Sequence, residues 1–147
     1  MPLSSVLILN GPNLNLLGSR EPVIYGSATL NEHLASATAA AKIHGVTIHT
    51  MQSNSESEIV DAVHTATGTH DAIIINAGAF THYSWALHDA LRSFKGHKIE
   101  VHLSNPSARE EFRHVSVLAG VVDGSISGFG GLSYVLAVQA LVALQSS

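Results

Sequence analysis

The sequence predicts an α/β fold in which one parallel sheet is covered by helices on both faces. Short apolar runs alternate with segments of helical periodicity along the chain, which is the order that builds strand–helix–strand units. The run at 72–75 is continuously apolar, as expected for a central strand that is buried on both sides. The chain has 147 residues, about the length of one domain, so we expect a single domain over 1–147.

Five segments are expected to be strands. Apolar and β-branched side chains are common in them, and turn-forming residues follow most of them. In chain order they cover residues 6–9, 46–51, 72–75, 99–103 and 120–126. Five strands suit the flavodoxin-like order 2-1-3-4-5, which places a ligand crevice outside the carboxyl ends of the strands.

Four segments are expected to be helices. Two capping boxes of the form Ser/Thr-x-x-Glu, beginning at Thr29 and Ser55, open the first two helices. Gly45 ends the first of these helices, and the second stops near Gly68. The expected helices lie within 29–45, 55–68, 84–94 and 133–144.

Composition and charge exclude several classes of function. The net charge of −4 leaves no basic surface of the kind that nucleic-acid binding needs. The absence of cysteine excludes disulfides, thiolate metal ligands and cysteine nucleophiles. No apolar run approaches the roughly 18 residues of a membrane span, and no charged segment precedes the first strand as in a signal peptide. We therefore expect a cytoplasmic protein with no nucleic-acid or membrane partner.

Cofactor chemistry is also disfavoured by the sequence. The turn after the first strand reads Asn-Gly-Pro-Asn at 10–13, which is neither a dinucleotide fingerprint nor a phosphate-binding loop. The chain has ten histidines, but no pair of them has the helical spacing of a zinc motif. We therefore expect no metal ion and no other cofactor.

Polar side chains gather after three of the expected strands. They are Asn10, Asn13, Arg20 and Tyr25 after the first strand, Asn76, Gly78, Thr81 and His82 after the third, and Glu100, His102, Ser104 and Asn105 at the end of the fourth. In this fold the carboxyl ends of these strands face one crevice. Their coincidence indicates a site more strongly than any one of the residues does.

Two pairs among these residues suit proton transfer. A guanidinium beside a phenol favours the phenolate, so Arg20 would help Tyr25 act as a base. Glu100 and His102 alternate along one strand and share a face, where a carboxylate can fix the tautomer of a histidine that donates a proton. With amides to hold an oxyanion through water, the set suits elimination of water.

Simpler explanations stay open for each of these residues on this evidence. Tyr25 is also compatible with a loop anchor, and Arg20 with a surface ion pair to Glu21 that stabilises little. Glu100 and His102 are equally compatible with a salt-linked edge strand.

Twelve short motifs, taken in order, resemble one family. They are LNGPNLNLLG at 9–18, REP at 20–22, YG at 25–26, QSN at 52–54, Glu56, NAGA at 76–79, TH at 81–82, Ser84, DA at 89–90, IEVHLSN at 99–105, REEFRH at 109–114 and GFG at 128–130. On these motifs the chain resembles the type II 3-dehydroquinate dehydratases, or type II dehydroquinases, from end to end.

The resemblance implies a flavodoxin-like fold and a hydro-lyase reaction, the trans-dehydration of 3-dehydroquinate to 3-dehydroshikimate in the shikimate or quinate pathway. It implies that Tyr25 accepts the proton from C2 of the substrate, with Arg20 activating it. His102 donates the proton to the leaving C1 hydroxyl, and Glu100 orients this histidine. Asn13 positions the water that stabilises the enolate.

The resemblance also implies a substrate-binding set and an assembly. The substrate-binding residues are Asn76, His82, Asp89, Leu103, Ser104 and Arg113. Asp89 corresponds to a residue that reaches into a neighbouring subunit's site, as in a homo-oligomer of trimers that assemble into a dodecamer. The segment 18–26 is expected to be a lid that closes over the substrate.

The sequence departs from the family pattern beside the substrate-binding histidine. Tyr83 stands where the family commonly has threonine, and a second large aromatic residue, Trp85, follows Ser84. Ser57, His88 and Val115 are further departures. None lies in the acid–base set, so we expect activity with altered affinity or assembly. The alternative function is a non-catalytic flavodoxin-like module that binds a small polyol acid. The intact set of Arg20, Tyr25 and His102 argues against that alternative.

Overall fold

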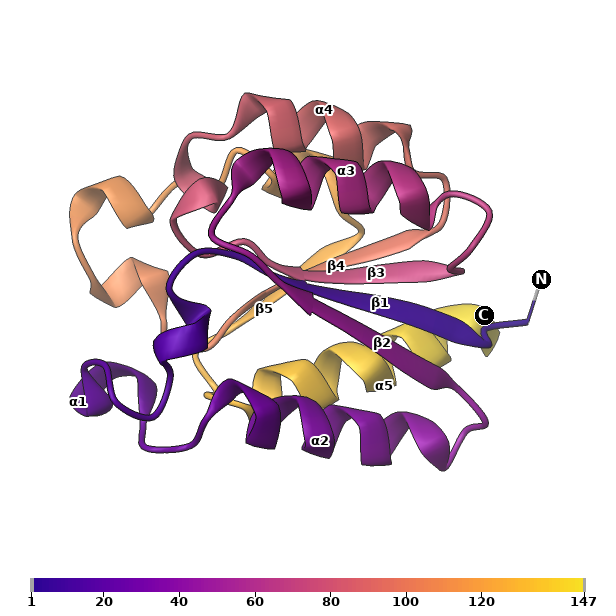
Figure 1. Ribbon diagram of the computed structural model, residues 1–147, viewed down its shortest axis with the longest axis horizontal. Coiled ribbons are helices and arrows are strands. Elements are labelled where there is room, and N and C mark those ends of the chain that lie inside the picture. Colours follow the sequence, from indigo (N-terminus) through magenta and orange to yellow (C-terminus); the bar gives the residue numbers. More distant parts are fainter. Residues whose placement is uncertain (1, 147) are drawn as a thin grey trace.

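The computed structural model describes residues 2–146, which form a sheet between two layers of helices (Figure 1). The sheet is parallel, and its five strands follow the order β2-β1-β3-β4-β5, which confirms the predicted order. The strands are β1 (Ser5–Asn10), β2 (Thr47–Gln52), β3 (Ala72–Asn76), β4 (His97–His102) and β5 (Gly124–Ser127). Their carboxyl ends lie at one edge of the sheet, opposite the two chain termini (Figure 1).

Two helices cover each face of the sheet. The long helices are α2 (Leu30–Lys42), α3 (Glu56–Ala66), α4 (Trp85–Ser93) and α5 (Leu132–Ser146). Helices α2 and α5 pack together on one face, and α3 and α4 pack together on the other. A short helix, α1 (Pro22–Tyr25), stands apart at the carboxyl edge of the sheet and was not expected from the sequence. Within residues 2–146, no helix is long and apolar enough to cross a membrane.

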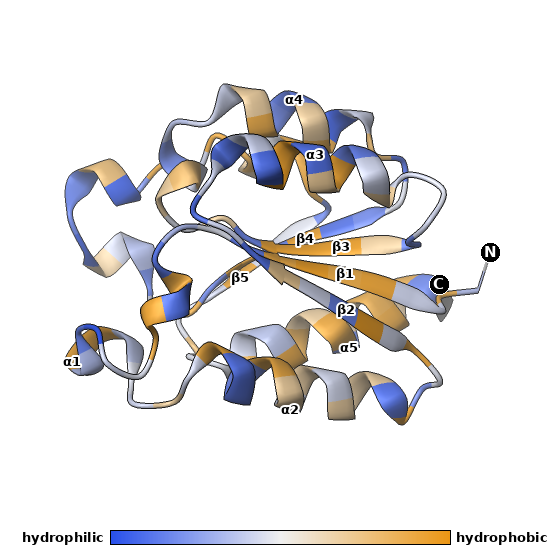
Figure 2. Cartoon of the chain, viewed as in Figure 1, coloured by the Kyte–Doolittle hydropathy of each residue, from blue (hydrophilic) through white to orange (hydrophobic). Residues whose placement is uncertain are grey.

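The two central strands supply side chains to a core on each face. Ile8 and Ile74 pack into the layer of α2 and α5, whereas Leu9 and Ile75 pack into the layer of α3 and α4. Successive side chains of a strand point to opposite faces, so a strand covered on both sides must be apolar at every position. Figure 2 shows this as nearly unbroken orange along β1 and β3.

The capping boxes are confirmed at one helix and only half formed at the other. At α2, Thr29 accepts from the N–H of Glu32 while the Glu32 carboxylate accepts from the N–H of Thr29. At α3, Ser55 accepts from the N–H of Glu58, but the Glu58 carboxylate accepts from the hydroxyl of Ser53 at 2.8 Å. The reciprocal bond expected at Ser55 is therefore replaced by one to a neighbouring turn.

The expected start of the fifth strand at residue 120 is wrong. Residues Ala119–Val121 form a 3₁₀ turn, and β5 begins only at Gly124. The hydroxyl of Ser116 accepts from the backbone N–H groups of Leu118 and Ala119, so local bonds hold this apolar stretch outside the ladder. The start of β3 at Ala72 is as expected, and the other boundaries differ by one to three residues from those expected.

Candidate active site

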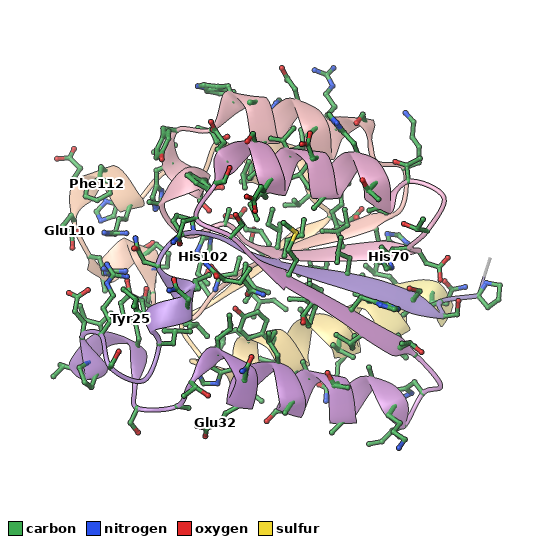
Figure 3. All side chains as sticks on the ribbon, viewed as in Figure 1. Tyr25, Glu32, His70, His102, Glu110 and Phe112 are labelled. Carbon is green, nitrogen blue, oxygen red and sulfur yellow. The ribbon has the colours of Figure 1, made fainter. Side chains whose placement is uncertain are left out.

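A cavity of about 770 Å³, counting space open to solvent, lies outside the carboxyl ends of the central strands. Figure 3 shows Tyr25 and His102 at this end of the molecule. The cavity brings together nine of the eleven residues expected from the sequence. They are Asn13, Arg20, Tyr25, Asn76, His82, His102, Leu103, Ser104 and Arg113.

The electrostatics of the cavity favour an anion. Three arginines, Arg20, Arg109 and Arg113, are among its lining residues. The described lining includes no aspartate or glutamate. Cations gathered in a concave site attract a ligand of opposite charge and raise its local concentration. The cavity therefore suits a small molecule that carries a carboxylate.

The phenol of Tyr25 is held by Arg109, a residue that the sequence analysis did not assign to the site. Nη1 of Arg109 donates a hydrogen bond of 2.7 Å to the phenolic oxygen, and a second one of 3.2 Å to the hydroxyl of Ser104. The guanidinium of Arg20 lies 5.5 Å from the centre of the Tyr25 ring and pairs with Glu21 at 3.4 Å. Arg109 makes the direct contact, and its place in the REEFRH motif was the available signal.

The segment 18–26, which supplies Arg20 and Tyr25 to the cavity lining, has an unusual backbone. Gly18 and Gly26 have φ values of 97° and 79°, so both of its ends are in the left-handed range that glycine adopts freely. Glu21 also has a positive φ, of 40°, which costs about 1 kcal/mol for a residue with a side chain. It precedes Pro22, whose ring suits the first position of α1.

His102 and Glu100 form a close pair on β4, as the alternation along the strand predicts. Nε2 of His102 lies 2.6 Å from Oε2 of Glu100. A carboxylate accepts the hydrogen bond, so Nε2 carries a hydrogen and Nδ1 is the nitrogen left for other chemistry. No hydrogen-bond partner for Nδ1 is found among residues 2–146. The histidine lines the cavity, and the carboxylate lies behind it.

Glu100 is a buried carboxylate, only 1% exposed, and two serines hold it. The hydroxyl of Ser116 lies 2.8 and 3.0 Å from its two oxygens, and that of Ser125 lies 3.4 Å from one of them. Buried charges need such donors, because burial without them is costly. Ser125 is the ladder partner of Glu100, whereas Ser116 lies in an irregular segment that gave no sequence signal.

The turn after β1 is fixed against the turn after β3. The N–H of Gly11 donates to the carbonyl of Asn76 at 2.8 Å, and a Cβ at position 11 would lie 2.3 Å from the carbonyl oxygen of Ala77. Asn13 follows with φ of 67°, and its N–H donates to Oδ1 of Asn54 at 3.0 Å. Only glycine permits the approach at position 11, which sets where Asn13 stands.

His82 and Arg113 line the wall near His102. Nδ1 of His82 lies 2.8 Å from the carbonyl oxygen of Val115, which can only accept, so Nδ1 carries the hydrogen. Nε of Arg113 donates to Glu110 at 2.6 Å, which lowers the pKa of that carboxyl, and its guanidinium lies 4.6 Å from the centre of the Phe112 ring. Both side chains are oriented before any ligand enters.

Asp89 lies outside the cavity of its own chain. It is on α4, its side chain is 78% exposed, and it pairs with His88 at 3.1 Å. Tyr83 and Trp85, 58% and 62% exposed, lie at the start of the same helix. One chain therefore does not bring Asp89 to the other predicted residues. Within residues 2–146, no group of three or more histidine and acidic side chains is placed to hold a metal ion.

Comparisons with known proteins assign the chain to a family. The family model "Dehydroquinase class II" matches residues 4–142. The "3-dehydroquinate dehydratase" of Ruegeria pomeroyi is 50% identical over 141 residues, 96% of this chain and 95% of the relative. That of a Nostoc species is 54% identical over 140 residues, 95% of each chain. The crystal structure of type II dehydroquinase from Butyrivibrio crossotus superposes with a TM-score of 0.92 at 42% identity, covering 95% of this chain and 97% of that one. The chain therefore belongs to the class II dehydroquinase family.

Proposed function

We propose that this chain catalyses the trans-elimination of water from 3-dehydroquinate, giving 3-dehydroshikimate through an enolate without a cofactor. The observation that carries the proposal is the pairing in one cavity of a phenol hydrogen-bonded by a guanidinium and a histidine hydrogen-bonded by a carboxylate. Elimination of water needs a base that removes a proton and an acid that protonates the leaving hydroxyl, and here each group has its own hydrogen-bond partner. The relatives named 3-dehydroquinate dehydratase support the same reaction.

The base in this proposal is Tyr25. Its phenolate takes the proton from C2 of the substrate, and the electron pair of that C–H bond moves toward the carbonyl to form the enolate. Two cations lie next to it: Arg109 donates to its oxygen at 2.7 Å, and the Arg20 guanidinium lies 5.5 Å from the centre of its ring. Asn13 holds the water that stabilises the enolate oxygen.

The acid in this proposal is His102. The enolate collapses with loss of the C1 hydroxyl, and His102 gives this hydroxyl a proton so that it departs as water. Because Nε2 is engaged by Glu100, the proton is delivered from Nδ1. Glu100 orients the ring and stabilises the charged histidine before the transfer.

The remaining residues of the cavity bind the substrate. Asn76, His82 and Arg113 contact its hydroxyl groups. The backbone N–H groups of Leu103 and Ser104 bind its carboxylate, and the three arginines of the cavity attract that charge.

The assembly and the cellular location stay predictions. Trimers that build a dodecamer would place Asp89 beside a neighbour's cavity and cover Tyr83 and Trp85, which are exposed here. The pathway, a cytoplasmic location and independence from metal ions rest on the sequence. Light scattering tests the assembly, and turnover unchanged by a chelator is the expected result for the metal.

The experiment that tests the function is turnover by Tyr25→Phe. Formation of the conjugated enone is followed by ultraviolet absorbance after 3-dehydroquinate is added. We expect the wild type to turn over and Tyr25→Phe to be inactive while binding substrate within about tenfold of the wild type, because the ring and its packing are kept. Ser36→Ala is the control, since it removes an exposed hydroxyl on α2 outside the cavity.

Two outcomes would contradict the proposal. A pure wild-type protein with no turnover from neutral to alkaline pH would instead support the alternative of a non-catalytic module that binds a polyol acid. Near-normal turnover by Tyr25→Phe would leave the reaction in place but rule out the phenol as its base.

A further inference from the structure

A chain of hydrogen bonds runs through the buried floor of the cavity and is centred on Tyr134 of α5. The phenol of Tyr134 donates to Oδ1 of Asn10 at 2.6 Å, and Nδ2 of Asn76 donates to the phenolic oxygen at 3.0 Å. Tyr134 and Asn10 have no exposed surface, and Asn76 is 3% exposed. Of these three residues only Asn76 lines the cavity, so Asn76 links the hydrogen-bond chain to the substrate side.

Both ends of the chain are backbone groups, and this fixes the direction of every bond in it. Nδ2 of Asn10 donates to the carbonyl of Met51 at 3.2 Å, and a carbonyl can only accept. The N–H of Gly78 donates to Oδ1 of Asn76 at 3.4 Å, because a backbone N–H can only donate. Burial also raises the pKa of Tyr134, so its phenol keeps the hydrogen that it gives to Asn10.

A flipped Asn76 carboxamide would break the chain at two places. Its oxygen would face the phenolic oxygen of Tyr134, whose single hydrogen is committed to Asn10, so two acceptors would meet. Its NH₂ group would face the N–H of Gly78, so two donors would meet. A buried polar group without a partner is costly, which makes the flipped state rare.

We propose that Tyr134 is a positioning residue that fixes the orientation of the Asn76 carboxamide, and so presets which polar atoms Asn76 offers to a substrate hydroxyl. The inference rests on the proposed role of Asn76 as a substrate-binding residue. Tyr134 lies on α5 and does not line the cavity. Among its two hydrogen-bond partners, Asn10 and Asn76, only Asn76 lines the cavity, so its hydroxyl reaches the substrate side through Asn76.

The test is a double-mutant cycle on KM with Tyr134→Phe and Asn76→Ala. Phenylalanine keeps the ring that fills the core and removes only the hydroxyl. We expect Tyr134→Phe to raise KM about tenfold with kcat within about threefold, because the contact is one of substrate binding. In the double variant we expect the KM of Asn76→Ala within about twofold, because Tyr134 has no effect once its target is gone.

A control separates positioning from general loss of structure. Tyr134→Phe also lowers the melting temperature, because two buried amides lose a partner, so all assays run well below that temperature. If Tyr134→Phe only loosened the structure, its fold-increase in KM would multiply that of Asn76→Ala in the double variant. This result overturns the inference. Ser36→Ala, which removes an exposed hydroxyl on α2 outside the cavity, should neither raise KM nor lower stability.

The remaining outcomes distinguish the inference from the function beneath it. An unchanged KM in Tyr134→Phe, with KM raised in Asn76→Ala, overturns the inference and leaves the proposed function standing. An unchanged KM in Asn76→Ala removes the binding role of Asn76 and the inference with it.

If Tyr134→Phe does not fold, neutron diffraction from wild-type crystals is the deciding experiment. We expect the Tyr134 deuterium on the bond to Asn10, and both Asn76 amide deuterons on the nitrogen next to Tyr134. The opposite arrangement overturns the inference.

Discussion

The guanidinium of Arg109 and the phenol of Tyr25 are joined by a hydrogen bond of 2.7 Å, although 84 positions separate them in the sequence. The same guanidinium nitrogen also donates to Ser104 at the end of β4. Arg109 thus ties the segment 18–26 to the sheet edge through the group proposed to be the base. One side chain therefore contacts both the proposed base and the turn that follows β4.

Replacement of Arg109 should therefore impair chemistry more than folding. A hydrogen bond to a charged group is worth about 1.5–3 kcal/mol, so we expect Arg109→Ala to lower kcat about 10- to 100-fold. Steady-state turnover followed by product absorbance measures this. Arg92→Ala is the control, because Arg92 lies on the exposed side of α4 away from the cavity. Equal kcat values for the two variants would show that the bond to Tyr25 has no part in the reaction.

The charge of Glu100 should matter beyond its shape. Glu100→Gln keeps an oxygen for His102 and Ser116 but removes the negative charge that stabilises a protonated histidine. We expect kcat to fall about 10- to 100-fold, since charge-assisted hydrogen bonds are roughly twice as strong as neutral ones. Ser125→Ala, which removes the longest bond to this carboxylate, should cost far less. A Glu100→Gln variant with wild-type kcat would contradict the assigned role.

Asp71 should make stability depend on pH. Its carboxylate accepts from the N–H and hydroxyl of Ser4 and the N–H of Ser5, and the backbone bond from Ser4 is the main cause of its lowered pKa. An unfolded aspartate ionises near pH 4, so the stabilisation is complete above about pH 4 and is lost as the pH falls through the lower folded-state pKa.

The matching experiment is chemical denaturation of Asp71→Asn at several pH values. We expect it to lower the free energy of unfolding by about 1 kcal/mol at pH 7, a modest figure because the site is partly exposed. The difference from the wild type should shrink below about pH 4. Asp61→Asn, at an exposed helix position, should show no such difference. A difference that does not vary with pH would mean that charge is not the cause.

Position 11 should tolerate no side chain. A Cβ there would lie 2.3 Å from a backbone carbonyl oxygen, which cannot move aside like a flexible side chain. We expect Gly11→Ala to lower the free energy of unfolding by about 1–3 kcal/mol and to lower activity by moving Asn13. Gly120→Ala, where nothing lies within 4 Å of the added atom, is the matched control. Similar melting temperatures for the two variants would refute the packing argument.

The features that could be predicted from the sequence are those marked by a periodic pattern of side chains or by a short local motif. The alternation of Glu100 and His102 across one residue gave their shared face, because a strand repeats every two residues. The Thr29 capping box gave the start of α2, and the apolar run of β3 gave its central place. The strand order followed from the succession of elements.

What was not predictable depends on contacts between irregular segments. Arg109 reaches Tyr25 from a stretch of 3₁₀ turns, and turns carry no periodicity that tells where a side chain points. Ser116 is similar, because its hydroxyl holds both Glu100 and the turn that delays β5. Tyr134 lies within the expected helix at 133–144, and only its partners in the structure reveal the use of its hydroxyl.

Three arginines line the cavity, and the described lining residues include no carboxylate to balance their charge, so the choice of assay buffer matters. Positive charge in a concave site attracts buffer anions such as sulfate, phosphate and citrate as well as a substrate carboxylate. A KM measured in phosphate then contains competition by the buffer as well as affinity for the substrate. Kinetic values for this protein are comparable only when the anion and the ionic strength of the buffer are held constant.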